Sequence, residues 1–404
     1  MAAMSAPPRE AFRLSQLLYD ARYRSLTIQV IASILIMLLL VELVNNTVTN
    51  LAALGKDISF GFLWTTAGYD INQQIIPFTS QDTHARAALV GILNTLVVAV
   101  LGCILATIIG VLVGVLRLSK NWLVSRLMGV YVEAMRNTPL LIWILIVFAV
   151  MTEATPQPRE FREGGSASMI LWDSVAISNR GVYIPRPVWG EGSGLVVAVF
   201  LLSVIGIFFL RAYARRRQEA TGDQLPVLWM SLGLFFLPAL LAFFALGRPI
   251  GLELPELGGF NFTGGIQVRN SFIALWLALS LYTSAFIAEN VRGGILAISK
   301  GQTEASFALG LRPNRTMQLV ILPQALRVII PPLISQYLNL TKNSSLAIAV
   351  GYMDVRSTLG GITINQTGRE LEGMLLLGIF YLITSLIISS FMNLYNSNVK
   401  LKER

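Results

Sequence analysis

Two stretches of this sequence carry polar side chains in patterns that could bind a ligand or a partner. The longer one, Glu289–Pro331, is punctuated by glycines and separates two apolar segments, whereas the shorter one, Asn339–Ser345, lies inside an apolar segment. Neither holds a cluster of metal ligands or a nucleophile beside a base. Cys103 and His84 are the only cysteine and histidine, so an intrachain disulfide is excluded, and we expect His84 to be exposed or interfacial. These residue types predict docking and binding rather than catalysis, with no metal and no cofactor.

The longer stretch predicts a short helix over Gln302–Leu311. Gly301 and Gly310 punctuate this segment, and Pro313 prevents its continuation. Glu304 falls near the N-terminal end, where a carboxylate complements the helix dipole. Such a helix, outside the apolar segments, indicates a surface on which a partner can dock.

Small and apolar residues give this predicted helix a contact face. Ala305 and Ala308 lie three residues apart and allow another surface to approach closely. Phe307 and Leu311, four residues apart, provide an apolar ridge. A second helix is expected over about 314–328. The alternative is an amphipathic loop that lies on a membrane surface.

The composition of the 404-residue chain is typical of a membrane protein. Hydrophobic residues make up 54% and charged residues 13%, with a mean hydropathy of +0.65. A soluble domain carries nearly twice that charged fraction. Apolar runs of about 20 residues match the length of a helix that crosses the hydrocarbon core. The net charge of +9 could indicate nucleic-acid binding, but the excess of Lys and Arg in cytoplasmic loops of membrane proteins explains it better.

Eight membrane spans are predicted, and the third is expected to begin before Pro139. The predicted ranges are 27–47, 87–116, 138–152, 194–211, 227–246, 271–289, 331–352 and 374–395. The helix at 314–328 then leads to Pro331-Pro332 and the seventh span. About 25 polar and basic residues precede the first apolar run, which is unlike a cleavable signal peptide.

The basic residues predict that both chain ends are cytoplasmic. Those that we place on the cytoplasmic side are Arg9, Arg13, Arg22, Arg24, Arg117, Lys120, Arg126, Arg136, Arg211, Arg215, Arg216, Arg217, Arg292, Lys300, Arg312, Arg315, Arg327, Lys400, Lys402 and Arg404. Eight crossings put all of them on one side. The outward loops, 48–86 and 153–193, hold Trp64, Tyr69, Trp172, Tyr183 and Trp189. These aromatic residues are expected to be interfacial anchors or, alternatively, contacts for an external partner.

The polar stretch resembles the EAA loop of bacterial ABC-importer permeases, the surface that receives force from an ATPase. The resemblance rests on Glu304-Ala305-Ser306, Gly310, Ile321 and Pro323, with Ser306 replacing the usual third alanine. It implies that Gly301, Glu304, Ala305, Ser306, Ala308, Gly310 and Arg312 form an ATPase-coupling loop. Arg292 and Arg312 could pair with acidic groups of the ATPase; alternatively, each could remain solvated or contact lipid headgroups.

Four further motifs, in order, resemble the polar amino-acid uptake permeases. They are Gly91-Ile92-Leu93-Asn94-Thr95-Leu96, Arg136-Asn137-Thr138-Pro139-Leu140-Leu141, Tyr282–Glu289 with Arg292-Gly293-Gly294, and Lys342-Asn343-Ser344-Ser345-Leu346. The resemblance covers about half the chain and implies an all-α membrane protein with a five-helix type I importer core. The additional spans make the chain similar to the larger permease subunit of general L-amino-acid importers of Gram-negative bacteria.

The resemblance implies a division of the chain into six segments. These are a cytoplasmic segment (1–26), an additional helix and periplasmic loop (27–86), the first core part (87–152), an insertion with two helices (153–270), the second core part (271–396) with the coupling loop 289–330, and a cytoplasmic tail (397–404). The insertion could pack beside the core or touch a binding protein.

The chain has no GxxxxGK[ST] phosphate loop, so the resemblance implies that separate subunits hydrolyse ATP. The implied partners are ABC ATPase subunits, a homodimer, together with a second permease in a heterodimer and a periplasmic amino-acid-binding protein. The implied location is the bacterial inner membrane. A secondary carrier is the alternative, but its coupling carboxylates should lie near the bilayer midplane. Glu42, Asp354 and Glu289 are the candidates, and each falls near a helix end.

Lys342 is the most informative charge within a predicted span. A lysine in hydrocarbon costs a few kcal/mol, so it should face a cavity or a partner. With its amide and hydroxyl neighbours it could hold the α-carboxylate of an amino acid. The alternative is a structural lysine bonded to helix carbonyls, or a misplaced span boundary. The substrate-pathway candidates are Lys342, Asn343, Ser344, Asn339, Tyr282 and Ser284, with Asn94 and Gln336 weaker.

Overall fold

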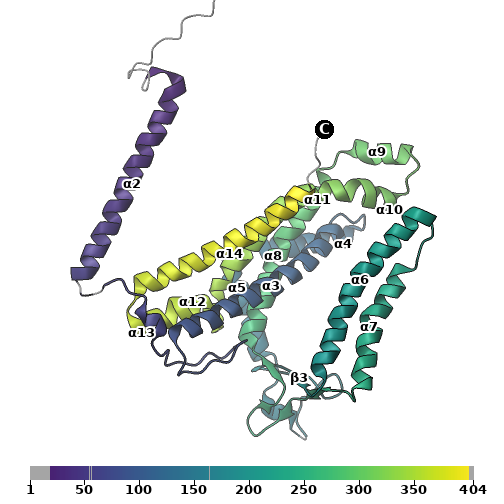
Figure 1. Cartoon of the computed structure of the whole chain (residues 1–404), viewed down its shortest axis with the longest axis horizontal. Helices are drawn as coiled ribbons and strands as arrows, with labels where there is room; N and C mark the ends of the chain where they lie inside the picture. Colours follow the sequence, from purple (N-terminus) through teal and green to yellow (C-terminus); the bar gives the residue numbers. More distant parts are fainter. Residues whose placement is uncertain (1–18, 54, 56, 163, 400–404) are drawn as a thin grey trace, which may run out of the picture.

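The computed structural model describes residues 19–53, 55, 57–162 and 164–399 (Figure 1). The predicted terminal segments 1–26 and 397–404 therefore lie largely outside the described residues. The described chain is mainly helical, as the sequence predicts. Its long helices are α2 (Ala21–Ala53), α3 (His84–Leu116), α6 (Ser193–Thr221), α7 (Val227–Ala245), α8 (Asn270–Leu296), α11 (Leu322–Asn343) and α14 (Glu370–Val399).

Within the described residues, seven helical segments are long and apolar enough to cross a membrane, and the bent pair α4 (Trp122–Asn137) and α5 (Leu140–Glu153) makes eight. This pair leads from the end of α3, on the side where α9 (Lys300–Ala308) lies, to the strands at the opposite side (Figure 1). It therefore makes one crossing, which agrees with the eight predicted spans.

The third span begins before Pro139, as predicted, but it is divided there into two helices. Asn121 caps α4, its side-chain oxygen accepting from the amides of Leu123 and Val124. The helix then stops at Thr138, which is extended because a residue before proline is disfavoured in the helical region. The next helix starts after Pro139 and is bent by 108° from α4. The segment before Pro139 is thus a separate helix.

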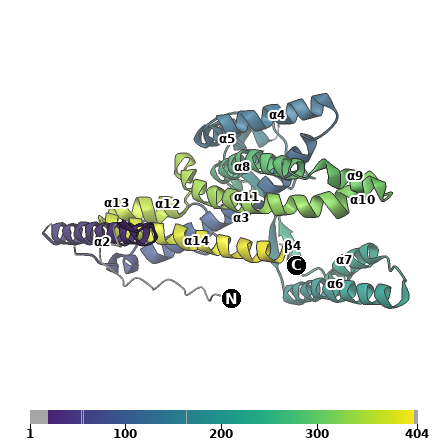
Figure 2. The same ribbon diagram turned by 90° about the horizontal axis from the view of Figure 1, so that it is seen from above.

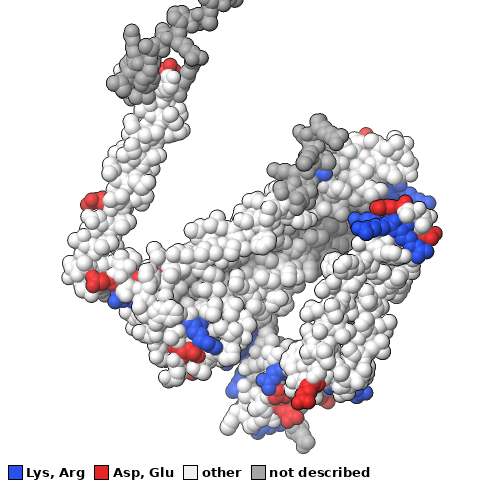
Figure 3. Space-filling model, in the orientation of Figure 1, with Lys and Arg blue, Asp and Glu red and all other residues white. Residues whose placement is uncertain are grey.

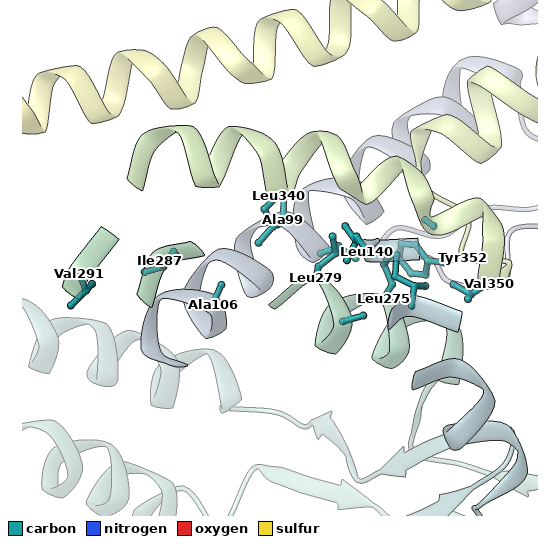
Figure 4. Close-up of a cluster of buried hydrophobic side chains, with 14 of the residues drawn as sticks. Ala99, Ala106, Leu140, Leu275, Leu279, Ile287, Val291, Leu340, Val350 and Tyr352 are labelled. Atoms are coloured by element: carbon teal, nitrogen blue, oxygen red, sulfur yellow. The ribbon is translucent and has the colours of Figure 1, made fainter. Parts of the chain in front are cut away.

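The α3–α8 contact forms the centre of the core. Glycines on α3 allow the backbones to approach: a Cβ on Gly110 would lie 2.9 Å from the Ser284 carbonyl, and one on Gly114 would lie 2.8 Å from that of Ala288. Small residues at such spacing are typical of helix packing in lipid. Around this contact a buried apolar cluster joins α3, α5, α8 and α11 (Figure 4). Its members include Ala99, Leu140, Leu275 and Leu340.

The helix predicted over 314–328 is not separate from the seventh span. The short helix α10 (Pro313–Thr316) continues through a π-helical turn, η3 (Met317–Ile321), directly into α11. Because Pro323 has no N–H and its ring would meet the carbonyl four residues earlier, a local widening of the helix is the physical expectation there. Pro331 and Pro332 lie inside α11 rather than before it. The helix predicted over 314–328 is therefore the start of the seventh span.

Beyond α11 the chain folds back against the opening of α3. After η4 (Ser344–Val350), short helical pieces α12 (Val355–Ser357), η5 (Thr358–Thr363) and α13 (Ile364–Thr367) precede α14. Asn94 Nδ2 donates to the carbonyls of Gln73 and Met353, each at 2.8 Å. Thr95 accepts from the Val355 amide at 3.1 Å. These bonds give a structural reason for the Gly91–Leu96 motif.

Two predictions about single side chains are wrong. His84 is 3% exposed, because it starts α3 beneath η5 and its Nδ1 lies 3.0 Å from the Thr363 hydroxyl. Tyr183 is 2% exposed and donates to Asn261, so it is a core residue rather than an interfacial anchor. By contrast Trp64, Trp172 and Trp189 are exposed.

The insertion forms a helical hairpin attached to a small β region. α6 and α7 pack on each other and lie apart from the core helices in both views (Figures 1 and 2). The strands are β1 (Ala176–Ser178), β2 (Gly181–Ile184), β3 (Arg186–Trp189), β4 (Ile250–Glu253), β5 (Glu256–Leu257), β6 (Phe262–Thr263) and β7 (Ile266–Val268). They pair antiparallel as β1-β2-β7, β3-β4 and β5-β6.

Charged residues gather at the two ends of the hairpin, and the surface between them is uncharged (Figure 3). The ends of the other elements lie on the same two sides of the molecule as the charged ends of the hairpin. The start of α2, the end of α14, the α6–α7 link and α9 lie on one side, and the strands lie on the other (Figure 1). This uncharged band between two charged ends is the pattern that a bilayer requires.

Candidate coupling loop and substrate pathway

The predicted docking helix exists as α9 and ends in a glycine cap. The amide of Gly310 donates to the Phe307 carbonyl at 2.9 Å, and that of Leu311 donates to the Ser306 carbonyl at 3.1 Å. These two bonds define a Schellman cap, which needs a left-handed residue. Gly310 supplies it with φ of +77°, and a Cβ there would meet nothing within 4 Å. Gly310 is thus required by the backbone, and it leaves the adjacent surface open.

One face of α9 is free to meet a partner. Glu304, Ala305 and Ala308 are exposed, as are Gly301 before them and Arg312 beyond the cap. Phe307 is 48% exposed and Leu309 82% exposed. The apolar element that sequence reasoning missed is Leu309; the predicted partner of Phe307, Leu311, is only half-exposed. An acidic group beside exposed apolar side chains makes a surface suited to docking.

Ser306 belongs to the opposite face of α9. It is 3% exposed and its hydroxyl donates to the Gln302 carbonyl at 2.6 Å. The Gln324 amide donates to Gln302 Oε1 at 3.3 Å and so ties the start of α9 to α11. A small side chain at 306 allows α9 to pack against α10 and η3. Ser306 therefore positions the helix and does not form its exposed surface.

A single carboxylate joins three helices beside this loop. Glu289 on α8 contacts Arg117 at the end of α3, and lies 3.5 Å from Arg136 on α4 and 3.7 Å from Arg292 on its own helix. Arg136 also lies over the Phe286 ring, 5.5 Å from its centroid. We call Glu289, Arg117, Arg136 and Arg292 the Glu289 cluster. Its members come from three separate segments of the sequence that meet in the fold, and their contacts hold α4 against α3 and α8 beside the candidate coupling loop.

The substrate-pathway candidates divide into exposed and engaged side chains. Lys342 and Asn339 are exposed, and with Ser335 they form a polar stripe at spacings of four and three residues on α11. Asn343 is half-exposed. An exposed polar stripe on a spanning helix requires a polar partner or an aqueous path, because lipid cannot satisfy it.

The other substrate-pathway candidates already have hydrogen-bond or packing partners within the protein. Ser284 is buried and shares a hydrogen bond of 2.7 Å with Tyr131 of α4. Ser344 is buried and donates to the Thr341 carbonyl. Tyr282 is half-buried and packs on Phe286, with ring centroids 5.1 Å apart. These residues support the helices around the stripe.

The three carboxylates considered for a secondary carrier are exposed, paired with arginines or used as a helix cap. Glu42 is exposed on α2, and Glu289 is engaged by arginines. Asp354 is fully buried, and its Oδ1 caps α12 by accepting from the amide and hydroxyl of Ser357, each at 2.9 Å. Burial raises the pKa of the Asp354 carboxyl to about 6. Among the described residues no group of three or more His, Cys, Asp and Glu could hold a metal ion.

Comparison with known proteins gives a consistent result. Residues 223–401 match the family model described as the binding-protein-dependent transport system inner membrane component. The glutamate/glutamine/aspartate/asparagine transport system permease protein BztB of Rhodobacter capsulatus is 55% identical, with 100% of each chain covered. The general L-amino acid transport system permease protein AapQ of Rhizobium johnstonii is 44% identical, covering 96% of this chain and 95% of the relative. The putative amino-acid ABC transporter permease protein YhdX of Escherichia coli is 41% identical, covering 94% and 95%.

Proposed function

We propose that this chain, which belongs to the permeases of binding-protein-dependent amino-acid ABC importers, forms half of a translocation pathway for L-amino acids. It is a multi-pass membrane subunit of an importer. The relatives that match nearly the whole chain are named for glutamate, glutamine, aspartate and asparagine or for general L-amino acids. Amino acids are therefore the proposed substrate class.

The observation that carries the coupling part of this proposal is the exposed face of α9. An ATPase that closes on ATP must push on a rigid element, and α9 is bound to α11 through Gln302 and Gln324. The Glu289 cluster includes Arg136, which lies near the end of α4, just before the bend at Pro139. Movement of an ATPase subunit can thus be passed to the core as a rigid-body change. The proposed coupling residues remain Gly301, Glu304, Ala305, Ala308, Gly310 and Arg312, with Ser306 in support.

The proposed assembly contains two ATPase subunits, a second permease and a periplasmic amino-acid-binding protein in the bacterial inner membrane. We place α9 and both chain ends in the cytoplasm, because the start of α2 and the end of α14 share a side with α9. The core then consists of 87–152 and 271–396. The insertion 153–270 places its strands outside, where the binding protein arrives.

Reconstitution tests this function against the secondary-carrier alternative. Liposomes should contain the purified complex, with the binding protein outside and ATP inside. We expect labelled glutamate or glutamine to accumulate only when ATP and the binding protein are both present. Accumulation driven by a proton or sodium gradient without ATP would contradict the importer assignment.

Replacing Lys342 with Met should lower uptake about tenfold or more, because hydrogen bonds to charged groups contribute about 1.5–3 kcal/mol. Lys342→Arg keeps the charge and should retain a larger part of the activity. Initial uptake rates are the measurement, and co-purification of all subunits shows that the complex is intact. Normal transport by an intact Lys342→Met complex would exclude the substrate role.

A further inference from the structure

A basic cavity of about 910 Å³ lies on the side of the core that carries α9. One face of α4 lines it, together with the end of α3 and one residue of α8. The charged side chains around it are Arg117, Lys120, Arg126, Arg292 and Glu133. Four cations therefore face one carboxylate, and the cavity has an excess of positive charge.

Two of these four cations form ion pairs within the described part of the chain, and the other two do not. Arg117 and Arg292 are paired with Glu289. Lys120 and Arg126 are exposed, and within the described part of the chain neither has an ion pair with an acidic residue. Glu133 is engaged as the acceptor of a 3.0 Å hydrogen bond from Asn137. The cavity therefore offers two free cations to an anionic ligand.

An apolar stripe runs along α4 beside Arg126, and Lys120 lies just before the start of this helix. Leu123, Leu127 and Val130 are 55–58% exposed and follow the helical spacing of four and three residues. Trp122 is 75% exposed and also lines the cavity. The opposite face of α4 is buried against α3 and α8 through Val132 and its neighbours. A charged cavity bordered by an exposed apolar stripe matches a molecule with an anionic head and a hydrocarbon tail.

We propose that this cavity binds the phosphate headgroup of an anionic phospholipid, whose acyl chains lie along Leu123, Leu127 and Val130. Basic pockets between membrane helices on the cytoplasmic side bind such headgroups. A free phosphate ion would use the same cations but not the apolar stripe. The bound lipid would hold α4 in place beside the Glu289 cluster.

The test measures binding of phosphatidylglycerol to the delipidated complex in mild detergent. Thermal stabilisation is followed as phosphatidylglycerol, phosphatidylcholine or inorganic phosphate is added. We expect phosphatidylglycerol alone to stabilise the native complex. Lys120→Gln with Arg126→Gln should weaken its apparent affinity about fivefold for each charge removed. Lys120→Gln alone serves if the double variant does not assemble.

A matched variant distinguishes a site from general surface charge. Arg215→Gln with Arg216→Gln removes the same charge from exposed positions on α6, away from the cavity. This control should bind phosphatidylglycerol as the native complex does. Equal weakening in both double variants, or no weakening in either, would overturn the site. Stabilisation by inorganic phosphate to the same extent would show a soluble-anion site and would overturn the lipid assignment.

Discussion

Replacing Gly310 with Asp should leave the protein in the membrane but reduce uptake and substrate-stimulated ATP hydrolysis at least thirtyfold. This is the effect expected when about 2 kcal/mol of binding free energy is lost at the centre of an interface. Two physical effects combine. A side chain at φ of +77° strains the Schellman cap by about 1 kcal/mol. A negative charge is also introduced beside Leu309 and Phe307, on the face proposed to meet the ATPase.

Two comparison variants separate these effects. Gly310→Ala introduces the strain without the charge, so it should cost less than Gly310→Asp. Gly222→Asp introduces both at the end of α6, where the glycine also has φ of +77° and open space around it. That variant should transport normally, because α6 belongs to the hairpin and not to the proposed coupling surface.

The measurements are the rate of ATP hydrolysis with and without loaded binding protein, and the amount of ATPase that co-purifies with the permease. Docking through α9 predicts that both fall in Gly310→Asp and that neither falls in Gly222→Asp. Normal stimulation of hydrolysis in Gly310→Asp would count against the coupling role of this loop.

The sequence predicts the membrane-spanning helices because their signal is local. Each apolar run is long enough to cross hydrocarbon, and the observed helices overlap the predicted ranges. The bend between α4 and α5 was missed, although Thr138 and Pro139 mark it, because an apolar run continues after the proline. The strands of the insertion were also missed. They contain two to four residues each, and β2 pairs with β7 across the whole α6–α7 hairpin.

At the candidate site, too, local signals predict the helix, whereas contacts between distant segments are not predicted. The glycines and proline around α9 are local signals, and they predicted a helix here, although α9 (Lys300–Ala308) begins and ends earlier than the predicted Gln302–Leu311. The outward direction of Leu309 and the burial of Ser306 depend on how α9 packs against η3 and α11. The Glu289 cluster could not be found from spacing, because Arg117 and Glu289 are 172 residues apart in the sequence. The motifs contain Arg136, Glu289 and Arg292, but they indicate neither Arg117 nor the contact between these residues.

Replacing Glu289 with Gln should destabilise the permease by about 2 kcal/mol. Removing one partner of a fully buried ion pair costs about 3–5 kcal/mol, because the remaining charge is left uncompensated. The exposed fraction here is 25% for Glu289, 13% for Arg117 and 39% for Arg136, so water lowers that cost. The substitution also leaves three guanidinium groups facing each other. The thermal midpoint of the purified complex should fall by a few degrees.

Glu133→Gln is the matched control, since it neutralises an exposed carboxylate on α4 outside the Glu289 cluster. Its effect should stay within about 0.5 kcal/mol. Adding Arg117→Gln to Glu289→Gln should restore part of the lost stability, because it removes the least exposed of the unpaired cations. Such a restoration is the signature of coupled charges, whereas independent packing defects would add. A Glu289→Gln complex as stable as the native one would show that the three arginines are satisfied without the carboxylate, and α4 would then be held by its apolar face alone.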